Sequence, residues 1–182
     1  MQQNKIKVQQ NKIAVAVSLA LGLVQLPASA QFDPTLELSD LNGQNGFSLN
    51  GVAADDFSGR SVSGAGDVNG DGIDDLIIGA RGADPNGNSD AGSSYVVFGS
   101  DSGLPNPFDL SAINGLNGFT INGVAAFDHS GISVSSAGDV NGDGIDDLII
   151  GAYLADPNGN NSAGSSYVVF GREKPIFKDG FE

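Results

Sequence analysis

The strongest constraint on this chain is an internal repeat, in which Asp67 and its surroundings recur at Asp139. The stretch 66–80 recurs letter for letter at 138–152. Over the longer stretches 43–99 and 115–171, the two copies differ at 11 of 57 aligned positions. A repeat with this spacing predicts two copies of one structural unit, which stack on each other or form part of a ring.

Short segments within each copy have the residue patterns of β-strands. One segment alternates apolar and polar residues between glycines, and a second alternates small residues. Two more are continuous apolar runs, which indicate strands buried on both faces. Four strands joined by short turns are typical of one β-propeller blade. The segments are 46–51, 61–65, 76–79 and 95–98 in the first copy, and 118–123, 133–137, 148–151 and 167–170 in the second.

Each copy also contains a loop with oxygen-bearing side chains at positions one, three, five and nine. A hard cation such as Ca²⁺ takes about six to eight oxygen ligands, so this spacing predicts a calcium site. Gly72 and Gly144 stand at position six, where a sharp bend lets the carbonyl of position seven join the ligands. The predicted ligands are Asp67, Asn69, Asp71, Ile73 and Asp75 in the first loop, and Asp139, Asn141, Asp143, Ile145 and Asp147 in the second.

Other calcium loops share the first half of this pattern. An EF-hand or a dockerin has an acidic residue at position twelve, whereas Ile78 and Ile150 stand there in this chain, inside strand-like runs. A hydrated acidic turn without metal is a third alternative, although its three converging carboxylates would repel one another. A second oxygen-rich pattern, at 84–90 and 156–162, contains Pro-Asn-Gly and is interpreted as a turn.

The N-terminal segment 1–30 has the form of a secretory signal. Three lysines precede the apolar run 13–26, and Ala28-Ser29-Ala30 provides a cleavage site. The run is too short to span a bilayer comfortably. We therefore expect cleavage after Ala30, no membrane span in the mature chain, and a secreted protein that is extracellular or at the cell surface.

Charge and cysteine content narrow the possible partners. Beyond residue 30, five basic and 22 acidic residues remain, a net charge of −17. Such a surface repels nucleic acid and attracts cations. The chain has no cysteine, so bound metal would take the place of the disulfides that hold many exported domains together.

These motifs together resemble the FG-GAP repeats of integrin-α-type β-propellers. The resemblance is carried by Phe-Ser-Gly-Arg-Ser-Val at 57–62, the loop 67–75, Leu-Ile-Ile-Gly-Ala at 76–80 and Gly-Ser-Ser-Tyr-Val-Val-Phe-Gly at 92–99. It covers nearly all of 36–171, and the second copy departs from the pattern at His129, which replaces Phe57. The resemblance implies that a hairpin loop between the first two strands of each blade holds Ca²⁺ through four side chains and one carbonyl. It also implies that Asp74 and Asp146 point away from the metal.

The predicted domain organisation is a signal peptide at 1–30, two repeats within 31–171 (about 36–107 and 108–171) and a tail at 172–182. The fold class is all-β, with two four-stranded propeller-type blades. One lone strand comes first, then a full blade, then three strands, so the last blade lacks its fourth strand. Two blades cannot close a ring, because closed propellers have about four to eight. The chain therefore forms a homo-oligomer through unpaired strands, a relic with exposed edges, or a two-blade sandwich.

The functional expectation is a secreted, calcium-binding, non-enzymatic module that binds or adheres to protein or glycan partners. A hydrolase or lyase acting on an extracellular polymer is the alternative from the enzyme class, and a purely structural assembly subunit is a third. The single histidine, His129, is expected to be packed or at the surface, and catalytic residue types are otherwise sparse. Asn160-Asn161-Ser162 matches a glycosylation sequon.

Overall fold

The computed structural model of the chain describes residues 34–173. The predicted signal peptide and residues 174–182 of the predicted tail lie outside this range. Residues 34–40 belong to a separate unit, where the 3-10 turn η1 (Leu38–Asp40) is closed by a hydrogen bond from the Asp40 N–H to the Glu37 carbonyl, 2.9 Å. Within 34–173 the only helices are 3-10 turns, and none has the length and apolar character needed to cross a membrane.

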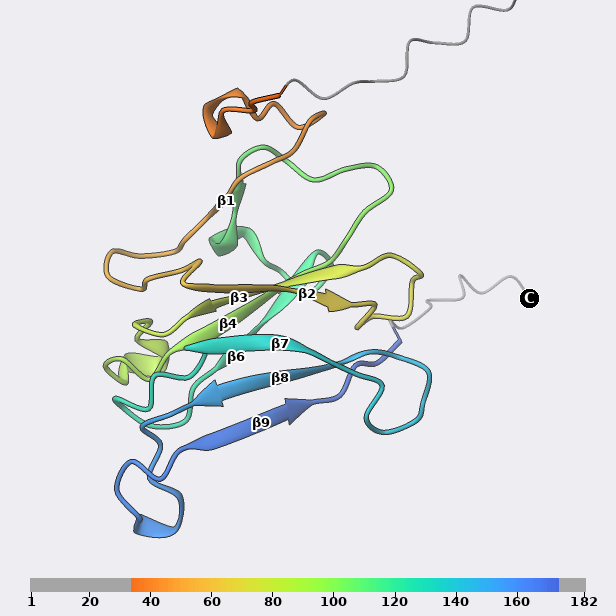
Figure 1. Cartoon of the computed structure of the whole chain (residues 1–182). Coiled ribbons are helices and arrows are strands. Elements are labelled where there is room, and N and C mark those ends of the chain that lie inside the picture. The colour runs from red at the N-terminus through yellow and green to blue at the C-terminus, as the bar shows by residue number, and fades with distance from the viewer. Residues whose placement is uncertain (1–33, 174–182) are drawn as a thin grey trace, which may run out of the picture. The chain divides into compact units, whose positions relative to one another are not determined.

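Residues 41–173 form two larger antiparallel sheets (Figure 1). The first sheet has the strand order β2 (Ser61–Gly66), β3 (Asp75–Ala80), β4 (Ser93–Val97) and β6 (Gly118–Asn122). The second sheet has the order β7 (Ser133–Gly138), β8 (Asp147–Ala152) and β9 (Ser165–Val169). The all-β class is therefore confirmed, as is the order of one four-stranded blade followed by a three-stranded one.

The sequence repeat is reproduced in the strand register. Leu76 on β3 pairs with Val97 on β4, and the copy of this pair in the second repeat, Leu148 on β8 and Val169 on β9, is formed in the same way. Both inner strands also carry a register irregularity at the same place, before Gly66 and before Gly138. The two sheets are thus two copies of one blade.

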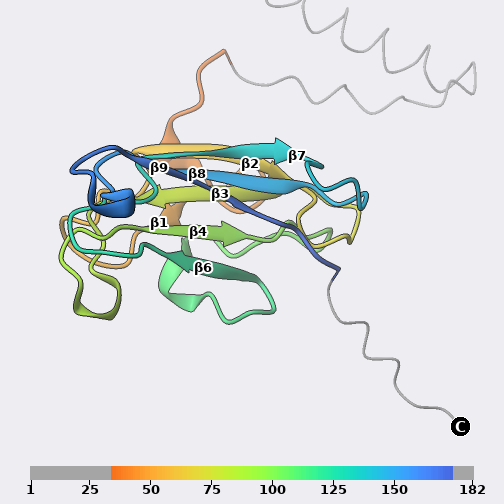
Figure 2. The ribbon, with the colours of Figure 1, turned by 90° about the horizontal axis from the view of Figure 1, so that it is seen from below.

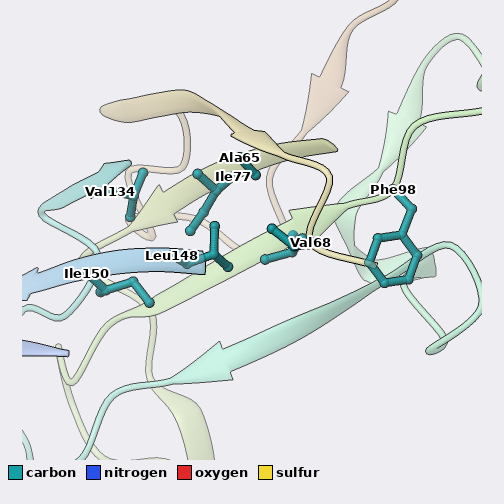
Figure 3. Close-up of a cluster of buried hydrophobic side chains, with 8 residues drawn as sticks. Ala65, Val68, Ile77, Phe98, Val134, Leu148 and Ile150 are labelled. Carbon is teal, nitrogen blue, oxygen red and sulfur yellow. The ribbon is translucent and has the colours of Figure 1, made fainter. Parts of the chain in front are cut away.

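The two blades pack face to face through one apolar cluster (Figures 1 and 2). Because side chains alternate along a strand, β3 directs Ile77 toward the second blade and Ile78 away from it. Figure 3 shows the side chains from β2 and β3 meeting those from β7 and β8. The buried members are Ala65, Val68, Ile77, Val96, Phe98, Val134, Leu148 and Ile150.

The outer face of the first blade is covered by the chain's own connecting segments. β5 (Phe108–Asp109) and the turn η3 (Leu110–Ala112) place Phe108 and Leu110 over Ile78 and its neighbours. The short strand β1 (Leu49–Asn50) pairs with β5 in parallel and adds Leu49 to this second cluster.

This arrangement corrects the prediction for the lone strand. The alternating pattern predicted a strand over 46–51, but only Leu49 and Asn50 make a ladder. The reason is the partner: β5 has two residues and turns into η3, so it offers β1 no longer edge. An alternating pattern determines which side chains face a core, but it does not determine which partner strand is available or how long that strand is.

A matched pair of substitutions tests the packing between the blades. Ile77→Ala removes a fully buried side chain and is expected to lower the free energy of unfolding by about 2–5 kcal/mol. Its repeat copy Ile149 is 38% exposed, so Ile149→Ala is expected to cost less than half as much in dilute solution. Urea unfolding followed by circular dichroism measures both, and equal losses would contradict this packing.

Candidate metal centre

The first candidate loop, which connects β2 to β3, is built around the carboxylate of Asp67. Its Oδ1 accepts a hydrogen bond from the Asp71 N–H (3.1 Å), and its Oδ2 accepts one from the Gly72 N–H (2.8 Å). Asp71 Oδ1 in turn accepts the Ile73 N–H at 3.1 Å. Gly72 has φ +85°, which confirms the sharp bend expected at position six.

The second loop, between β7 and β8, has nearly the same internal bonds. Asp139 accepts hydrogen bonds from the N–H groups of Gly142 (2.6 Å), Asp143 (3.0 Å) and Gly144 (2.9 Å). The Ile145 N–H donates to Asp143 Oδ1 at 3.0 Å, and Gly144 has φ +89°. Side chains at positions one and five therefore hold both loops in a common shape.

The aspartates at position nine have a structural role that the spacing did not predict. Asp75 is fully buried, and its two oxygens accept the Val68 N–H (3.0 Å) and the Gly99 N–H (2.8 Å). Asp147 is equally buried and accepts the equivalent N–H groups of Val140 (2.8 Å) and Gly171 (2.9 Å). Each carboxylate thus joins the start of its loop to the end of the blade's third strand.

The electrostatic surroundings of Asp75 favour a nearby cation. Burial is the main cause that raises the pKa of Asp75 from its ordinary value to about 6, and the neighbouring charges of Asp71 and Asp67 contribute to the rise. The N–H groups of Gly99 and Val68 act in the opposite direction and lower this pKa. A bound cation would offset both the burial and the repulsion between the carboxylates.

Asn69 gives the clearest sign that a ligand fits the first loop. Its side chain is buried, and its Oδ1 has no hydrogen-bond partner among the described residues. Its Nδ2 lies 3.4 Å from both oxygens of Asp75. A buried acceptor left without a partner costs about 1–3 kcal/mol, which an oxygen-seeking cation would recover. Its repeat copy Asn141 is exposed and donates to Asp143 Oδ2 at 2.9 Å.

The predicted ligands of each site lie in one loop, but their side chains do not converge on a common point. In the part of the chain that the structure describes, no three Asp, Glu, His or Cys side chains form a group able to hold a metal. The carboxylates at positions one and five are occupied by backbone N–H groups instead. The ligand set therefore stays a prediction, supported by the donor types and by the Asn69 oxygen, which no residue in the described part of the chain pairs with.

The two loops lie against each other at one end of the stacked blades. The Asp67 N–H donates to Asp146 Oδ2 at 3.0 Å, and the Asp146 N–H donates to the Asp67 carbonyl at 3.1 Å. Asp146, at position eight, is therefore directed at the neighbouring loop. A Cβ at Gly66 would overlap with the Asp146 carboxylate, so this contact needs a glycine there.

The second oxygen-rich pattern forms a turn in both copies, as interpreted from the sequence. Asp84 Oδ1 accepts the Asp90 N–H at 2.7 Å across η2 (Pro85–Gly87), and Asp156 Oδ1 accepts the Ser162 N–H at 2.5 Å across η4 (Pro157–Gly159). These carboxylates are engaged in closing the turns.

His129 is packed at the junction between the blades. Its Nδ1 donates to the Arg81 carbonyl at 3.2 Å, and its ring stacks on Tyr153 with 6.0 Å between the ring centroids. The first contact joins the second blade to the first, and the second holds the ring in place. Of the two expected positions for this histidine, packed or at the surface, the structure has the packed one.

A hollow of about 560 Å³ lies at the opposite end of the first sheet from the loops. Four aspartates line it, at 55, 56, 84 and 90, together with Tyr95. Asp56 is already engaged, since its Oδ2 accepts the Ala53 N–H at 3.0 Å. This hollow is separate from the candidate metal centre.

Removing the buried carboxylate tests its structural role apart from any metal. Asp75→Ala in buffer with excess EDTA is expected to lower the free energy of unfolding by about 2–4 kcal/mol, because the Val68 and Gly99 N–H groups lose their acceptors. Asp74→Ala, an exposed neighbour with the same charge, is the control and should cost under about 0.5 kcal/mol. Chemical unfolding measures both, and equal effects would refute the role assigned to Asp75.

Comparison with known proteins gives an independent assignment of the blades. The family model described as FG-GAP repeat matches residues 58–97 and 130–169. Phosphatidylinositol-glycan-specific phospholipase D of Rattus norvegicus is 34% identical over 115 residues, which cover 62% of this chain and 13% of that protein. Integrin alpha-PS2 of Drosophila melanogaster is 28% identical over 152 residues (81% and 10%), and integrin alpha pat-2 of Caenorhabditis elegans is 35% identical over 105 residues (56% and 8%).

The chain spans about a tenth of the length of these relatives. Both matched segments begin just before an inner strand, β2 or β7, and end at the last residue of a third strand, β4 or β9. Each therefore contains one candidate metal loop and three strands of one blade. The chain thus carries two FG-GAP repeats, one in each of its stacked blades.

Proposed function

We propose that this protein is a secreted, calcium-stabilised binding or adhesion module without enzymatic activity, with protein or glycan partners. The observation that carries the calcium assignment is the buried Oδ1 of Asn69, which has no hydrogen-bond partner within the described range 34–173 and lies in a loop otherwise lined by carboxylates. Export is inferred from the signal-like form of residues 1–30.

In each loop, the side chains at positions one, three, five and nine and the carbonyl at position seven would hold the ion. Bound Ca²⁺ would neutralise the clustered carboxylates and fix the loop. Asp75 and Asp147 would connect the fixed loop to the rest of the blade, because each accepts a hydrogen bond from a backbone N–H just beyond the third strand. Calcium is therefore assigned a structural role in which folding and binding are coupled.

The adhesion assignment rests on the repeat type and on the integrin alpha similarity. The second candidate is a hydrolase or lyase acting on an extracellular polymer. The similarity to a phospholipase D favours it, but that match covers only 13% of the enzyme.

Calcium is expected to raise the melting temperature. If each site binds with a dissociation constant near 1 mM, 10 mM Ca²⁺ adds about 1.4 kcal/mol per site, or about 3 kcal/mol for two. This corresponds to a rise of about 5–10 °C for a domain of this size. Differential scanning calorimetry with and without EDTA measures the rise.

Asp71→Ala combined with Asp143→Ala should abolish the rise, because both loops lose a central ligand. Asp74→Ala combined with Asp101→Ala removes the same charge from exposed positions outside the proposed ligand set and should keep it. A melting temperature that does not respond to EDTA in the unsubstituted protein would refute calcium binding.

Binding and turnover separate the two candidate functions. The calcium-loaded protein is expected to be retained on members of a glycan array or on immobilised extracellular matrix proteins, and to leave polysaccharide and phosphatidylinositol-glycan substrates intact. Chromatography of the substrates after incubation detects cleavage. Turnover without retained binding would overturn the adhesion assignment in favour of the enzyme.

A further inference from the structure

The outer face of the second blade is exposed, whereas the equivalent face of the first blade is buried. Val96 and Phe98 in the first blade are 0% and 8% exposed, because they pack against the second blade. Their copies Val168 and Phe170 are 46% and 57% exposed. Equivalent side chains thus form half of the interface between the blades in the first repeat, but in the second repeat no described residue buries them.

The second blade also lacks a strand at the edge beside this face. In the first blade, β4 pairs with β3 on one side and with all five residues of β6 on the other. In the described part of the chain, the copy of β4, which is β9, pairs only with β8 (Figure 1). An open strand edge is a template for pairing with another strand.

The chain contains a second copy of the strand that this edge lacks. Gly46-Phe-Ser-Leu-Asn50 is the repeat copy of β6, Gly118-Phe-Thr-Ile-Asn122. Both begin with a glycine in the same conformation, φ +147° at Gly46 and +151° at Gly118. Both are preceded by the same turn, in which this glycine's carbonyl accepts an N–H three residues upstream, at 2.9 Å for Gly46 and 3.0 Å for Gly118.

Within its own chain, this segment forms only a short ladder, and the first blade separates it from β9. Only Leu49 and Asn50 form a ladder, and it is parallel, whereas β6 makes five antiparallel pairs. Leu49 packs on the outer face of the first blade with Ile78, while Val169 at the end of β9 packs on the opposite, inter-blade face with Ile77. The first blade therefore stands between the donor strand and the open edge of the same chain.

We propose that the open edge of β9 is completed by residues 46–50 of a second copy of this chain. The register follows from the β4–β6 pairing, transferred to the equivalent positions of the other repeat: Ser165 pairs with Asn50 of the second copy, Val168 with Phe47 and Val169 with Gly46. In the first blade, Phe119 and Ile121 of β6 pack on the inter-blade cluster. Phe47 and Leu49 would cover Val168 and Phe170 in the same way.

This contact is head to tail, because it joins β9 in the second blade of one copy to the donor strand beside the first blade of another. Such an interface continues until a ring closes. With the two blades that the described residues of each copy form and about four to eight blades in a closed propeller, the ring holds about two to four copies. Leaving the first blade costs the donor strand its two-residue ladder, the packing of Phe47 and Leu49 on the second cluster, and the hydrogen bonds of Ser48 with Asn106 and Phe108. In exchange it gains a ladder of five antiparallel pairs and a new apolar surface for the same two side chains.

A glycine provides a selective test of the interface. A Cβ at Gly79 would overlap with the Gly131 carbonyl, across the junction of the two blades within one chain. Its copy Gly151 has room in the single chain, since the nearest atom to an added Cβ would be the Cβ of Ser133, at 3.6 Å. In the proposed assembly, Gly59 of the second copy would lie beside Gly151 as Gly131 lies beside Gly79, once Phe108 and Leu110 of that copy have moved off the outer face of its first blade.

Sedimentation velocity of the purified protein measures the assembly. We expect two to four copies for the unsubstituted protein, and a monomer with unchanged circular dichroism and cooperative unfolding for Gly151→Ala. Gly79→Ala is the matched control. It should weaken the cooperativity of unfolding, because the added Cβ would overlap with the Gly131 carbonyl at the junction of the two blades within one chain. A monomeric unsubstituted protein, or a Gly151→Ala protein that assembles normally, would overturn the proposal.

Engineered cysteines test the register, since the natural chain has none. Ser93 Oγ lies 3.2 Å from Asn122 Oδ1, so Ser93→Cys with Asn122→Cys should form a disulfide within one chain and serves as the control. The equivalent pair, Ser165→Cys with Asn50→Cys, is expected to link different chains and to give multimers on a non-reducing gel. A disulfide within one chain, or none, would refute strand exchange between copies.

Discussion

The structure depends on one repeated interaction, the buried aspartate at the start of the second strand of each blade. Asp75 and Asp147 are fully removed from solvent, yet both their oxygens accept backbone N–H groups, one from the loop and one from beyond the third strand. A buried carboxylate is tolerated only when it is so satisfied. The loop, the hairpin and the outer part of each blade are therefore held as one unit, and the candidate metal loop sits on it.

Much of the fold could be predicted from the sequence, because the relevant information was local. Alternation and apolar runs placed β2, β3, β4 and β6 in one blade and β7 to β9 in the next. Gly72 and Gly144 bend as expected, since only residues with little steric cost adopt φ near +85°. A repeat doubles every local signal, so agreement between the copies strengthened each assignment.

What could not be predicted depends on contacts between distant segments. β5 is a two-residue partner for β1 that no pattern marks, and it arises because Phe108 and Leu110 find an uncovered apolar face. The contact of Asp146 with the Asp67 backbone was equally hidden, since it requires the blades to be stacked first. At the candidate site, the residue types and their order came from the sequence, but the burial that separates Asn69 from Asn141 came only from the stacking.

The face-to-face contact between the two blades joins unlike faces of two nearly identical units. The face of the first blade that contains Val96 packs against the second blade. The equivalent face of the second blade, which contains Val168, is exposed. Such a contact can be repeated wherever the outer face of the next blade is free of the connecting segments that cover the first blade. Duplication or deletion of one whole repeat in the gene would therefore alter the number of blades while reusing a junction that already works.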